Sequence, residues 1–488
     1  MSGTIGESRL RRIPRGVWIS AAAAVALLLA VSGRYGFHRD ELYFIVAGRR
    51  IDWGFIDQPP LTPLVARVSE SVFGLSPTAI RIFPALTVGV VSVVSAVMAR
   101  RFGADRAGQV FAAFASGFTG VLLGVGHLLS TAAFDYALWT LGLCFLVLIL
   151  DGADPRWWLA LGATVGVGMQ NKYTIGFFAV ALLVGLLASD QRHLLASPLP
   201  WLGVAIATVI ALPNLIWQVT NGWPQIEMAD ALRTRSDGPL SFVLSQPLLA
   251  SPPLAIPAGA GLWWLARSDD SRRWRPIPIA YGLLVLTFLA TGGKAYYLAP
   301  MFSVLHAAGA VWFERLSAGL RRGMMAVAAL GAIGSILVAL PVLPVEQSGT
   351  FDATGEVGET VGWTLLVDDI RSAYDSIPPG ERDGAVVFTD SYGEAGAVDV
   401  LGRAQGLPAA ASGHNNYWLW GPPDSHGPII GVGSVALLLD SICPDLAEVA
   451  TLGNPYGVEN EVVGKPLLLC LDPHGQLSDI WDEARHFN

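Results

Sequence analysis

The stretch GFHRDELYFIVAGRRIDWGFIDQPPLTP (residues 36–63) is the most informative part of the sequence and follows directly on its first long apolar segment. Two carboxylates, Asp40 and Glu41, lie at the border of that segment. Residues 40–50 can form a short amphipathic helix with arginines near its end. The Asp-Gln-Pro-Pro sequence at 57–60 predicts a break and then another short helix, because Pro is tolerated in a first helical turn.

The composition excludes most soluble classes of protein. Hydrophobic residues make up 52% of the 488 residues and charged residues only 14%, against about 25% charged in an average soluble domain. The mean hydropathy is +0.49. These values exclude a disordered chain, a nucleic-acid binder and an ordinary cytosolic enzyme, and they predict a polytopic membrane protein.

The charge is divided unevenly along the chain. Residues 1–345 contain 26 Lys and Arg against 17 Asp and Glu, a net charge of +9. Residues 346–488 contain 5 Lys and Arg against 22 Asp and Glu, a net charge of −17. We therefore expect a membrane domain at 1–344 and a soluble domain at 345–488, which is long enough for one small fold.

Apolar runs of about 20 residues are needed to span a membrane, and the chain contains about eleven candidates. The first could be mistaken for a cleaved signal peptide, but its length favours an uncleaved anchor. The candidate spans are 16–33, 78–99, 107–125, 130–150, 156–170, 173–189, 200–218, 242–266, 276–292, 295–313 and 323–343.

The arginines predict the orientation of these spans. If the N-terminus is cytoplasmic, the inner loops contain 16 of the 26 Lys and Arg of the membrane domain, including Arg9, Arg11 and Arg12. Short cytoplasmic loops carry an excess of positive charge. We therefore expect a multi-pass protein of the cytoplasmic membrane, with residues 34–77 and the C-terminal domain outside.

The acidic C-terminal segment is typical of an α/β domain. Residues 385–388 and 467–471 are predicted as buried strands and residues 391–402 as a helix. Cys443 and Cys470 can form a disulfide if this domain is extracytoplasmic, or they can be two buried thiols. The expected fold class is thus a polytopic α-helical membrane protein with a C-terminal extracytoplasmic α/β domain.

Two carboxylates of the first outer loop, Asp40 and Asp57, are catalytic candidates together with Glu41. Carboxylates beside the bilayer can act as a general base or bind a divalent cation. The alternative is that they cap helices and carry interfacial charge.

Two lysines predict an anion site. Lys172 and Lys294 are the only lysines of the membrane domain, and both fall at outer helix ends, with Tyr296 and Tyr297 following Lys294. An ammonium group near the bilayer is costly without an anion to meet it, so we expect these residues to bind an anionic group. The alternative is that the lysines snorkel to the interface.

Seven segments together resemble the protein O-mannosyltransferase-like group of membrane glycosyltransferases (family 39, GT-C fold), which includes relatives of the lipid A aminoarabinose transferase. The first two, Phe-His-Arg-Asp-Glu-Leu-Tyr-Phe and Asp-Gln-Pro-Pro-Leu, are long and specific. The segments are 37–44, 57–61, 133–135, 171–174, 293–300, 390–396 and 412–423.

This resemblance implies a reaction and a set of roles. A sugar carried on a polyprenyl phosphate would be transferred, outside the membrane and with inversion, to a hydroxyl of a glycan, lipid or protein acceptor. The resemblance implies that Asp40 is essential, either as base or as metal ligand, and the phosphate would meet the two lysines. A divalent cation held by Asp40 and Asp57 is the candidate cofactor.

Further residues are candidates for supporting or acceptor-binding roles. Asp135 is an acid at the outer edge of a span and either supports the Asp40 region or satisfies a helix start. The run 414–418 offers amides and aromatic rings suited to a sugar face, or it anchors the domain on the membrane. The full set is His38, Arg39, Tyr43, Gln58, Asp135, His414, Asn415, Asn416, Tyr417 and Trp418.

Two other functions compete with a transferase. A transporter or lipid-sugar flippase would tend to show repeated halves and broken helices at the midplane, whereas this sequence has no repeat and its acids cluster at the outer edge. A non-catalytic assembly subunit would not need intact motifs at 40–41 and 57–60. The sequence also lacks a P-loop, His-Glu-x-x-His and Gly-x-Ser-x-Gly.

Overall fold

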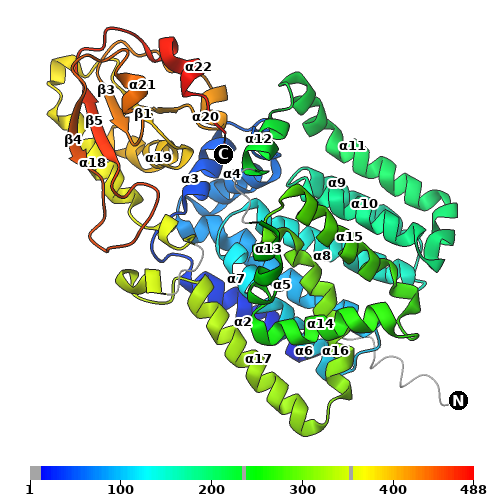
Figure 1. The fold of residues 1–488 in the computed structure, drawn as a ribbon. Coiled ribbons are helices and arrows are strands. Elements are labelled where there is room, and N and C mark those ends of the chain that lie inside the picture. Colours follow the sequence, from blue (N-terminus) through cyan, green and yellow to red (C-terminus); the bar gives the residue numbers. More distant parts are fainter. Residues whose placement is uncertain (1–12, 234–237, 351–354, 488) are drawn as a thin grey trace, which may run out of the picture. The chain divides into compact units, whose positions relative to one another are not determined.

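The computed structural model describes residues 13–233, 238–350 and 355–487, which form many helices and one five-stranded sheet (Figure 1). Arg9, Arg11 and Arg12, which contribute to the predicted orientation, lie outside these residues. The chain packs into two compact units. Unit 1 contains the described parts of Met1–Val31, Arg81–Ile216 and Arg235–Leu340, and unit 2 those of Ser32–Ile80, Trp217–Thr234 and Pro341–Asn488.

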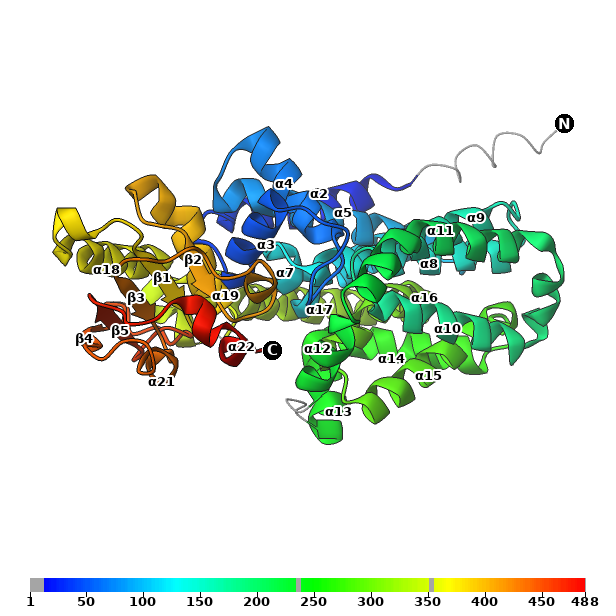
Figure 2. The same ribbon diagram turned by 90° about the horizontal axis from the view of Figure 1, so that it is seen from above.

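Unit 1 is helical. Within it α14 packs on α16, α8 on α9, and α10 on α15 (Figure 2). Its helices, two of which continue into unit 2 at one end, are α2 (Arg15–Val31), α5 (Pro77–Arg101), α6 (Arg106–Gly117), α7 (Gly120–His127), α8 (Thr131–Leu150), α9 (Trp157–Met169), α10 (Thr174–Leu187), α11 (Pro198–Thr220), α13 (Gly238–Leu249), α14 (Pro252–Arg267), α15 (Pro276–Thr291), α16 (Phe302–Arg315) and α17 (Ala318–Ala339).

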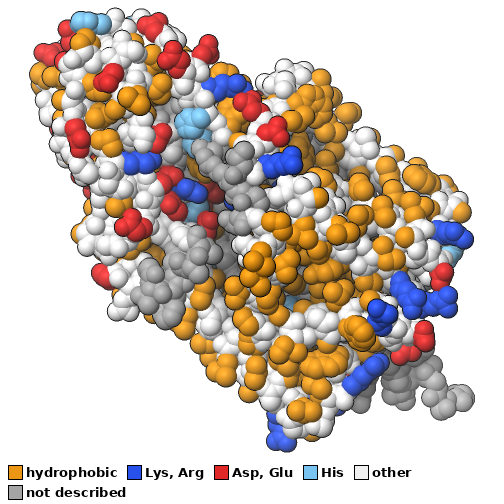
Figure 3. Space-filling view, viewed as in Figure 1, with side chains coloured by type: hydrophobic (Ala, Val, Ile, Leu, Met, Phe, Trp, Pro, Cys, Tyr) orange, Lys and Arg blue, Asp and Glu red, His pale blue; other side chains and the backbone are white. Residues whose placement is uncertain are grey.

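The described helices include five that are long and apolar enough to cross a membrane, or up to eight if each of three bent pairs is one span. Unit 1 also exposes large apolar side chains, as a lipid-facing surface does. Figure 3 shows hydrophobic side chains over α13, α14, α15 and α17, where the exposed residues include Leu244, Leu248, Trp263, Leu286 and Leu330. Membrane helices are thus present, and the count of eleven stays a prediction.

Several apolar runs are broken where the sequence predicted one helix. The predicted span 242–266 is two helices, α13 and α14, bent by 101°. Ser251 has a positive φ of 66° and is followed by Pro252, which starts a new helix because it lacks an N–H. The predicted span 107–125 is likewise α6 and α7, bent by 57°. The span 295–313 begins as a 3₁₀-helix, η3 (Ala295–Met301), before α16.

Unit 2 combines the first loop, one short segment and the C-terminal region. Its elements are α3 (Arg39–Arg49), α4 (Leu61–Phe73), α12 (Pro224–Arg233), α18 (Trp363–Ser376), β1 (Val386–Thr389), α19 (Tyr392–Ala397), β2 (Ala410–Ser412), α20 (Asn416–Leu419), β3 (Ile429–Val432), α21 (Ala436–Leu439), β4 (Ala447–Thr451), β5 (Pro466–Cys470) and α22 (Trp481–Ala484). The predicted helices after residues 40 and 60 and the predicted strands at 385–388 and 467–471 are present within two residues.

The sheet has the strand order β2-β1-β3-β5-β4. Strand β1 runs parallel to β2 and β3, with Val387 opposite Ala410 and Ile430, while β5 is antiparallel to β3 and β4. Val386 and Phe388 pack in one buried cluster with residues of α21 and α22, and α18 and α19 also contact the sheet. The C-terminal region is therefore α/β, as predicted, and its location outside the membrane stays a prediction.

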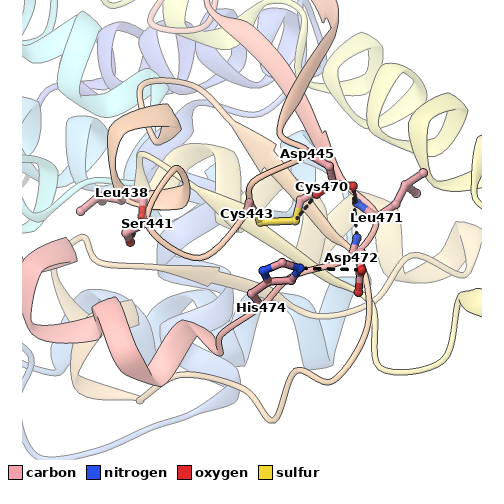
Figure 4. Close-up of a disulfide and its surroundings, with 8 residues drawn as sticks. All are labelled: Leu438, Ser441, Cys443, Asp445, Cys470, Leu471, Asp472 and His474. Carbon is pink, nitrogen blue, oxygen red and sulfur yellow. Dashed lines mark hydrogen bonds and ion pairs between the residues drawn. A yellow bond between two sulfur atoms is a disulfide. The ribbon is translucent and has the colours of Figure 1, made fainter.

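A disulfide joins Cys443 to Cys470, linking the turn after α21 to the end of β5 (Figure 4). Beside it, the Asp445 carboxylate accepts the backbone N–H groups of Leu471 and Asp472 at 3.2 and 3.3 Å. Of the two alternatives that the sequence left open, the structure has the disulfide.

Candidate active site

Helix α3 begins with a reciprocal cap that fixes the first carboxylates of the loop. The His38 ring accepts the N–H of Asp40 at 3.2 Å, and the Glu41 carboxylate accepts the N–H of His38 at 2.8 Å. These bonds satisfy donors that a helix start would otherwise leave unpaired. Glu41 is fully buried, and its carboxylate caps the start of α3.

Asp40 lies in the first turn of α3 with its side chain 34% exposed. Its Oδ1 atom accepts a 2.8 Å hydrogen bond from the Tyr392 hydroxyl and lies 3.7 Å from Nε of Arg39. Its Oδ2 atom is 4.0 Å from Nδ1 of His38. Burial, followed by the nearby Asp40 charge, raises the pKa of the Tyr392 hydroxyl well above its usual value, so this hydroxyl stays a donor.

Asp57 is held in the same way by a second tyrosine. The Tyr43 hydroxyl donates to Oδ1 of Asp57 at 2.7 Å, and Tyr43 is buried. Burial raises the pKa of Asp57 from 3.8 to about 7, against the opposing effect of the Tyr43 hydrogen bond. The rings of Tyr43 and Tyr392 lie 4.9 Å apart, so the two carboxylates share one aromatic cluster.

Helices α3 and α19 come close because α19 carries glycines where they meet (Figure 1). A Cβ atom at Gly393 would lie 2.9 Å from the Cβ of Arg39. One at Gly396 would lie 3.0 Å from backbone and Cβ atoms of Leu42. Real Cβ atoms essentially never show a contact of 2.9 Å, and a contact of 3.0 Å is tighter than most of theirs, so the close approach of these helices depends on the two glycines.

A second chain of contacts links α3 to the C-terminal region. Arg39 forms an ion pair of 3.0 Å with Glu461, which accepts a 2.8 Å hydrogen bond from the Ser391 hydroxyl. Ser391 is the N-cap of α19. Behind it, buried Glu394 pairs with Lys465 at 3.1 Å, and burial raises the pKa of Glu394 to about 8. The first residues of α19 and its N-cap thus contact Asp40 directly, through Tyr392, and Arg39 indirectly, through Glu461.

The side chain of Gln58 is buried without a visible polar contact. Its amide nitrogen and oxygen have no hydrogen-bond partner among the described residues. Its backbone carbonyl accepts the N–H of Phe55 at 2.9 Å, which closes the turn before α4.

The predicted sugar-facing run 414–418 is folded into unit 2. Asn416 accepts the N–H of Ile56 at 2.6 Å, and Tyr417 donates to Asp399 at 3.0 Å. Trp418 donates to a backbone carbonyl of α22. The ring of His414 packs 4.6 Å from that of Tyr392, and Asn415 is buried. The observed contacts of this run are therefore with the first loop and with its own domain.

Unit 1 contains Asp135 and the residues predicted to bind the donor phosphate. Asp135 is buried and accepts hydrogen bonds from Trp139 at 3.0 Å and Thr174 at 2.8 Å. Lys172 lies at the end of the segment that precedes α10. Its Nζ is 3.3 Å from the Tyr296 hydroxyl and within 4.8 and 4.6 Å of the rings of Tyr296 and Tyr297.

Lys294 differs from Lys172 in its surroundings. It is the residue before η3 and is half-buried. In the part of the chain that the structure describes, its ammonium group has no ion pair or hydrogen bond. Lys172 is thus oriented by aromatic rings, whereas Lys294 is not.

The predicted cation ligands do not form a metal site. Within residues 13–233, 238–350 and 355–487, no group of three or more His, Cys, Asp or Glu side chains is placed to hold a metal ion. One oxygen of Asp40 and one of Asp57 already accept tyrosine hydroxyls. Since hard divalent cations need several oxygen ligands, these two carboxylates do not by themselves make up a ligand set for such an ion.

Several residues that contact the first loop or Asp135 were not predicted from the sequence. Tyr392 and Glu461 contact the first loop from more than 350 residues away, and Trp139 and Thr174 orient Asp135. The segment 390–396 was part of the family resemblance but gave no role for Tyr392. No spacing rule connects such distant positions.

Comparison with known proteins gives two kinds of match. Residues 57–217 match the family model of dolichyl-phosphate-mannose-protein mannosyltransferases. The predicted family resemblance is confirmed. A comparison with curated protein sequences returned no match.

Solved structures of two proteins share the fold. The crystal structure of ArnT from Cupriavidus metallidurans bound to undecaprenyl phosphate is 17% identical, with 92% of this chain and 97% of that chain covered and a TM-score of 0.63. The apo form of ArnT has 17% identity, coverages of 95% and 98%, and a TM-score of 0.61. The arabinofuranosyltransferase AftD from Mycobacteria is 15% identical, with a TM-score of 0.53, but the match covers 94% of this chain and 40% of AftD. At this identity the likeness shows the fold, which is the GT-C fold of membrane glycosyltransferases.

Proposed function

We propose that this protein is a glycosyltransferase that moves a sugar from a polyprenyl-phosphate donor to a hydroxyl acceptor. The observation that carries the proposal is the oriented pair of carboxylates in the first loop, Asp40 and Asp57, on a GT-C fold. The mannosyltransferase family match over 57–217 and the undecaprenyl phosphate bound by ArnT support a lipid-linked donor.

The chemistry assigns Asp40 the role of general base. The acceptor hydroxyl attacks the anomeric carbon of the sugar, the bond from that carbon to the phosphate oxygen breaks, and the polyprenyl phosphate leaves with the electron pair. Asp40 takes the hydroxyl proton as the new bond forms, and a single displacement inverts the anomeric centre. Glu41 caps the helix that carries the base, and Asp57 orients the acceptor.

The leaving phosphate needs positive charge. Lys172 and Lys294 supply it, and Tyr296 and Tyr297 hold the Lys172 ammonium in place. Asp135, which accepts hydrogen bonds from Trp139 and Thr174, has a supporting role. His38, Arg39, Tyr43 and Gln58 shape the first loop, and the run 414–418 supports it from the C-terminal region.

We further propose that the C-terminal region lies outside the cytoplasmic membrane and that the N-terminus is cytoplasmic. The Cys443–Cys470 disulfide favours this orientation, because disulfides persist in oxidising compartments. A reporter that is active only outside the membrane, fused after Asn488, should be active. If that reporter is silent, and a reporter that is active only in the cytoplasm works at the same position, the proposed orientation is wrong.

Mass spectrometry of cell-envelope glycans, with and without the gene, tests the proposed function. Deletion should remove one sugar linkage, and the wild-type gene should restore it, whereas an unchanged glycan profile would argue against the proposal. Loss of a flippase would also remove a linkage. The purified protein is therefore given undecaprenyl-phosphate hexoses and pentoses with the identified acceptor, and only a transferase forms the glycosidic bond.

A further inference from the structure

The C-terminal region contributes a side chain to the proposed base. The Tyr392 hydroxyl, in the first turn of α19, donates to Oδ1 of Asp40 at 2.8 Å. We infer that Tyr392 is a positioning residue for Asp40, so that the active site is incomplete without the C-terminal region. This inference rests on the proposed function of Asp40.

Tyr392 is itself held in place on three sides. Ser391 caps α19 in a reciprocal box with Glu394, directly after β1. The N–H of Tyr392 lies 3.4 Å from Nδ1 of His414, and its ring packs between those of Tyr43 and His414, at 4.9 and 4.6 Å. The hydroxyl therefore has a fixed position relative to the sheet.

The hydrogen bond from Tyr392 gives the two oxygens of Asp40 different surroundings. Oδ1 accepts the tyrosine hydroxyl, while Oδ2 is 4.0 Å from Nδ1 of His38 in a side chain that is one-third exposed. A carboxylate has lone pairs on both oxygens, so fixing one oxygen sets the direction in which the other faces. Tyr392 thus aims Oδ2 at the acceptor hydroxyl, and misplacement of a reacting group by about 1 Å can cost about 100-fold in rate.

A second contact leads to the same end of α19. Arg39, the neighbour of Asp40, pairs with Glu461 at 3.0 Å, and Glu461 accepts the hydroxyl of Ser391. Both routes from the first turn of α3 therefore end at Ser391 and Tyr392. The close approach of the two helices at Gly393 and Gly396 leaves them little freedom to shift.

The test uses full-length Tyr392→Phe in nanodiscs, because phenylalanine keeps the ring packing and removes only the hydroxyl. We expect kcat to fall between about 10- and 100-fold, with an unchanged donor KM and unchanged binding of undecaprenyl phosphate. Tyr35→Phe is the matched control, since its hydroxyl donates to the Leu343 carbonyl at 2.6 Å within the same unit. This control should keep the wild-type kcat.

A double-mutant cycle of melting temperatures tests the contact without any activity. If the bond exists, Tyr392→Phe combined with Asp40→Ala, which removes the accepting oxygens, loses less melting temperature than the sum of the single losses. Additive losses, or a wild-type kcat in Tyr392→Phe, would overturn the inference. A wild-type protein that transfers no sugar would instead overturn the proposed function, while the cycle still reports on the contact.

Discussion

The hydroxyl of Tyr392 donates to the carboxylate of Asp40 at 2.8 Å, although 352 residues separate the two positions in the sequence. The first loop and the C-terminal region are therefore one structural unit. The orientation of Asp40 therefore depends on a residue of the C-terminal region.

Loss of either lysine should weaken donor binding. A charge-assisted hydrogen bond to a phosphate contributes about 1.5–3 kcal/mol, so Lys172→Ala and Lys294→Ala should each weaken undecaprenyl phosphate binding by about 10- to 150-fold. Lys294→Arg should restore binding only in part, because guanidinium is larger and planar. Binding is measured by calorimetry in detergent, with Arg272→Ala, an exposed arginine paired with Asp190, as control. Full binding by Lys294→Ala would show that Lys294 only snorkels.

Stability should fall as pH rises because of Asp57. The pKa of Asp57 is raised to about 7 in the folded protein, from 3.8. Between these values the folded protein binds a proton that the unfolded chain has released, so this contribution is fully present below pH 3.8 and is lost as pH rises through about 7. Asp57→Asn should therefore reduce the fall in melting temperature between about pH 5 and pH 8. Asp472→Asn, on an exposed carboxylate, is the control, and an unchanged slope in Asp57→Asn would contradict the account.

The close packing of α3 against α19 should require glycine at position 396. Gly396→Leu places a side chain where a Cβ already lies 3.0 Å from Leu42. Overpacking of this kind typically costs about 1–3 kcal/mol. We expect a lower melting temperature and loss of transfer, because Asp40 moves away from Tyr392. Gly380→Leu is the control, since its Cβ would meet nothing within 4 Å, and equal effects of the two variants would remove the contact from the account.

Local patterns predicted elements well and distant contacts poorly. The apolar run 78–99 became α5 (Pro77–Arg101), and the break at 57–60 was followed by α4. The bend at Ser251 was missed, because apolar residues continue on both sides of it. For Glu41 the structure has the helix capping that the sequence left open as an alternative, at the spacing of a capping box from His38. The Tyr392 contact depends on the fold of the whole unit, and no local pattern contains it.

Direct transfer by Asp40→Asn is the measurement that tests the central claim. Asn keeps the size of the side chain and its hydrogen bond from Tyr392 but cannot take a proton, and general base catalysis contributes about 10²–10⁴-fold. With a polyprenyl-phosphate sugar in nanodiscs, Asp40→Asn should fold, bind undecaprenyl phosphate and lose transfer by that factor. Asp57→Asn should lose less, Glu41→Gln should be milder still because Gln also caps a helix, and Asp52→Asn in the same loop should keep activity. Near-normal transfer by Asp40→Asn, with normal folding and binding, would remove Asp40 from the mechanism.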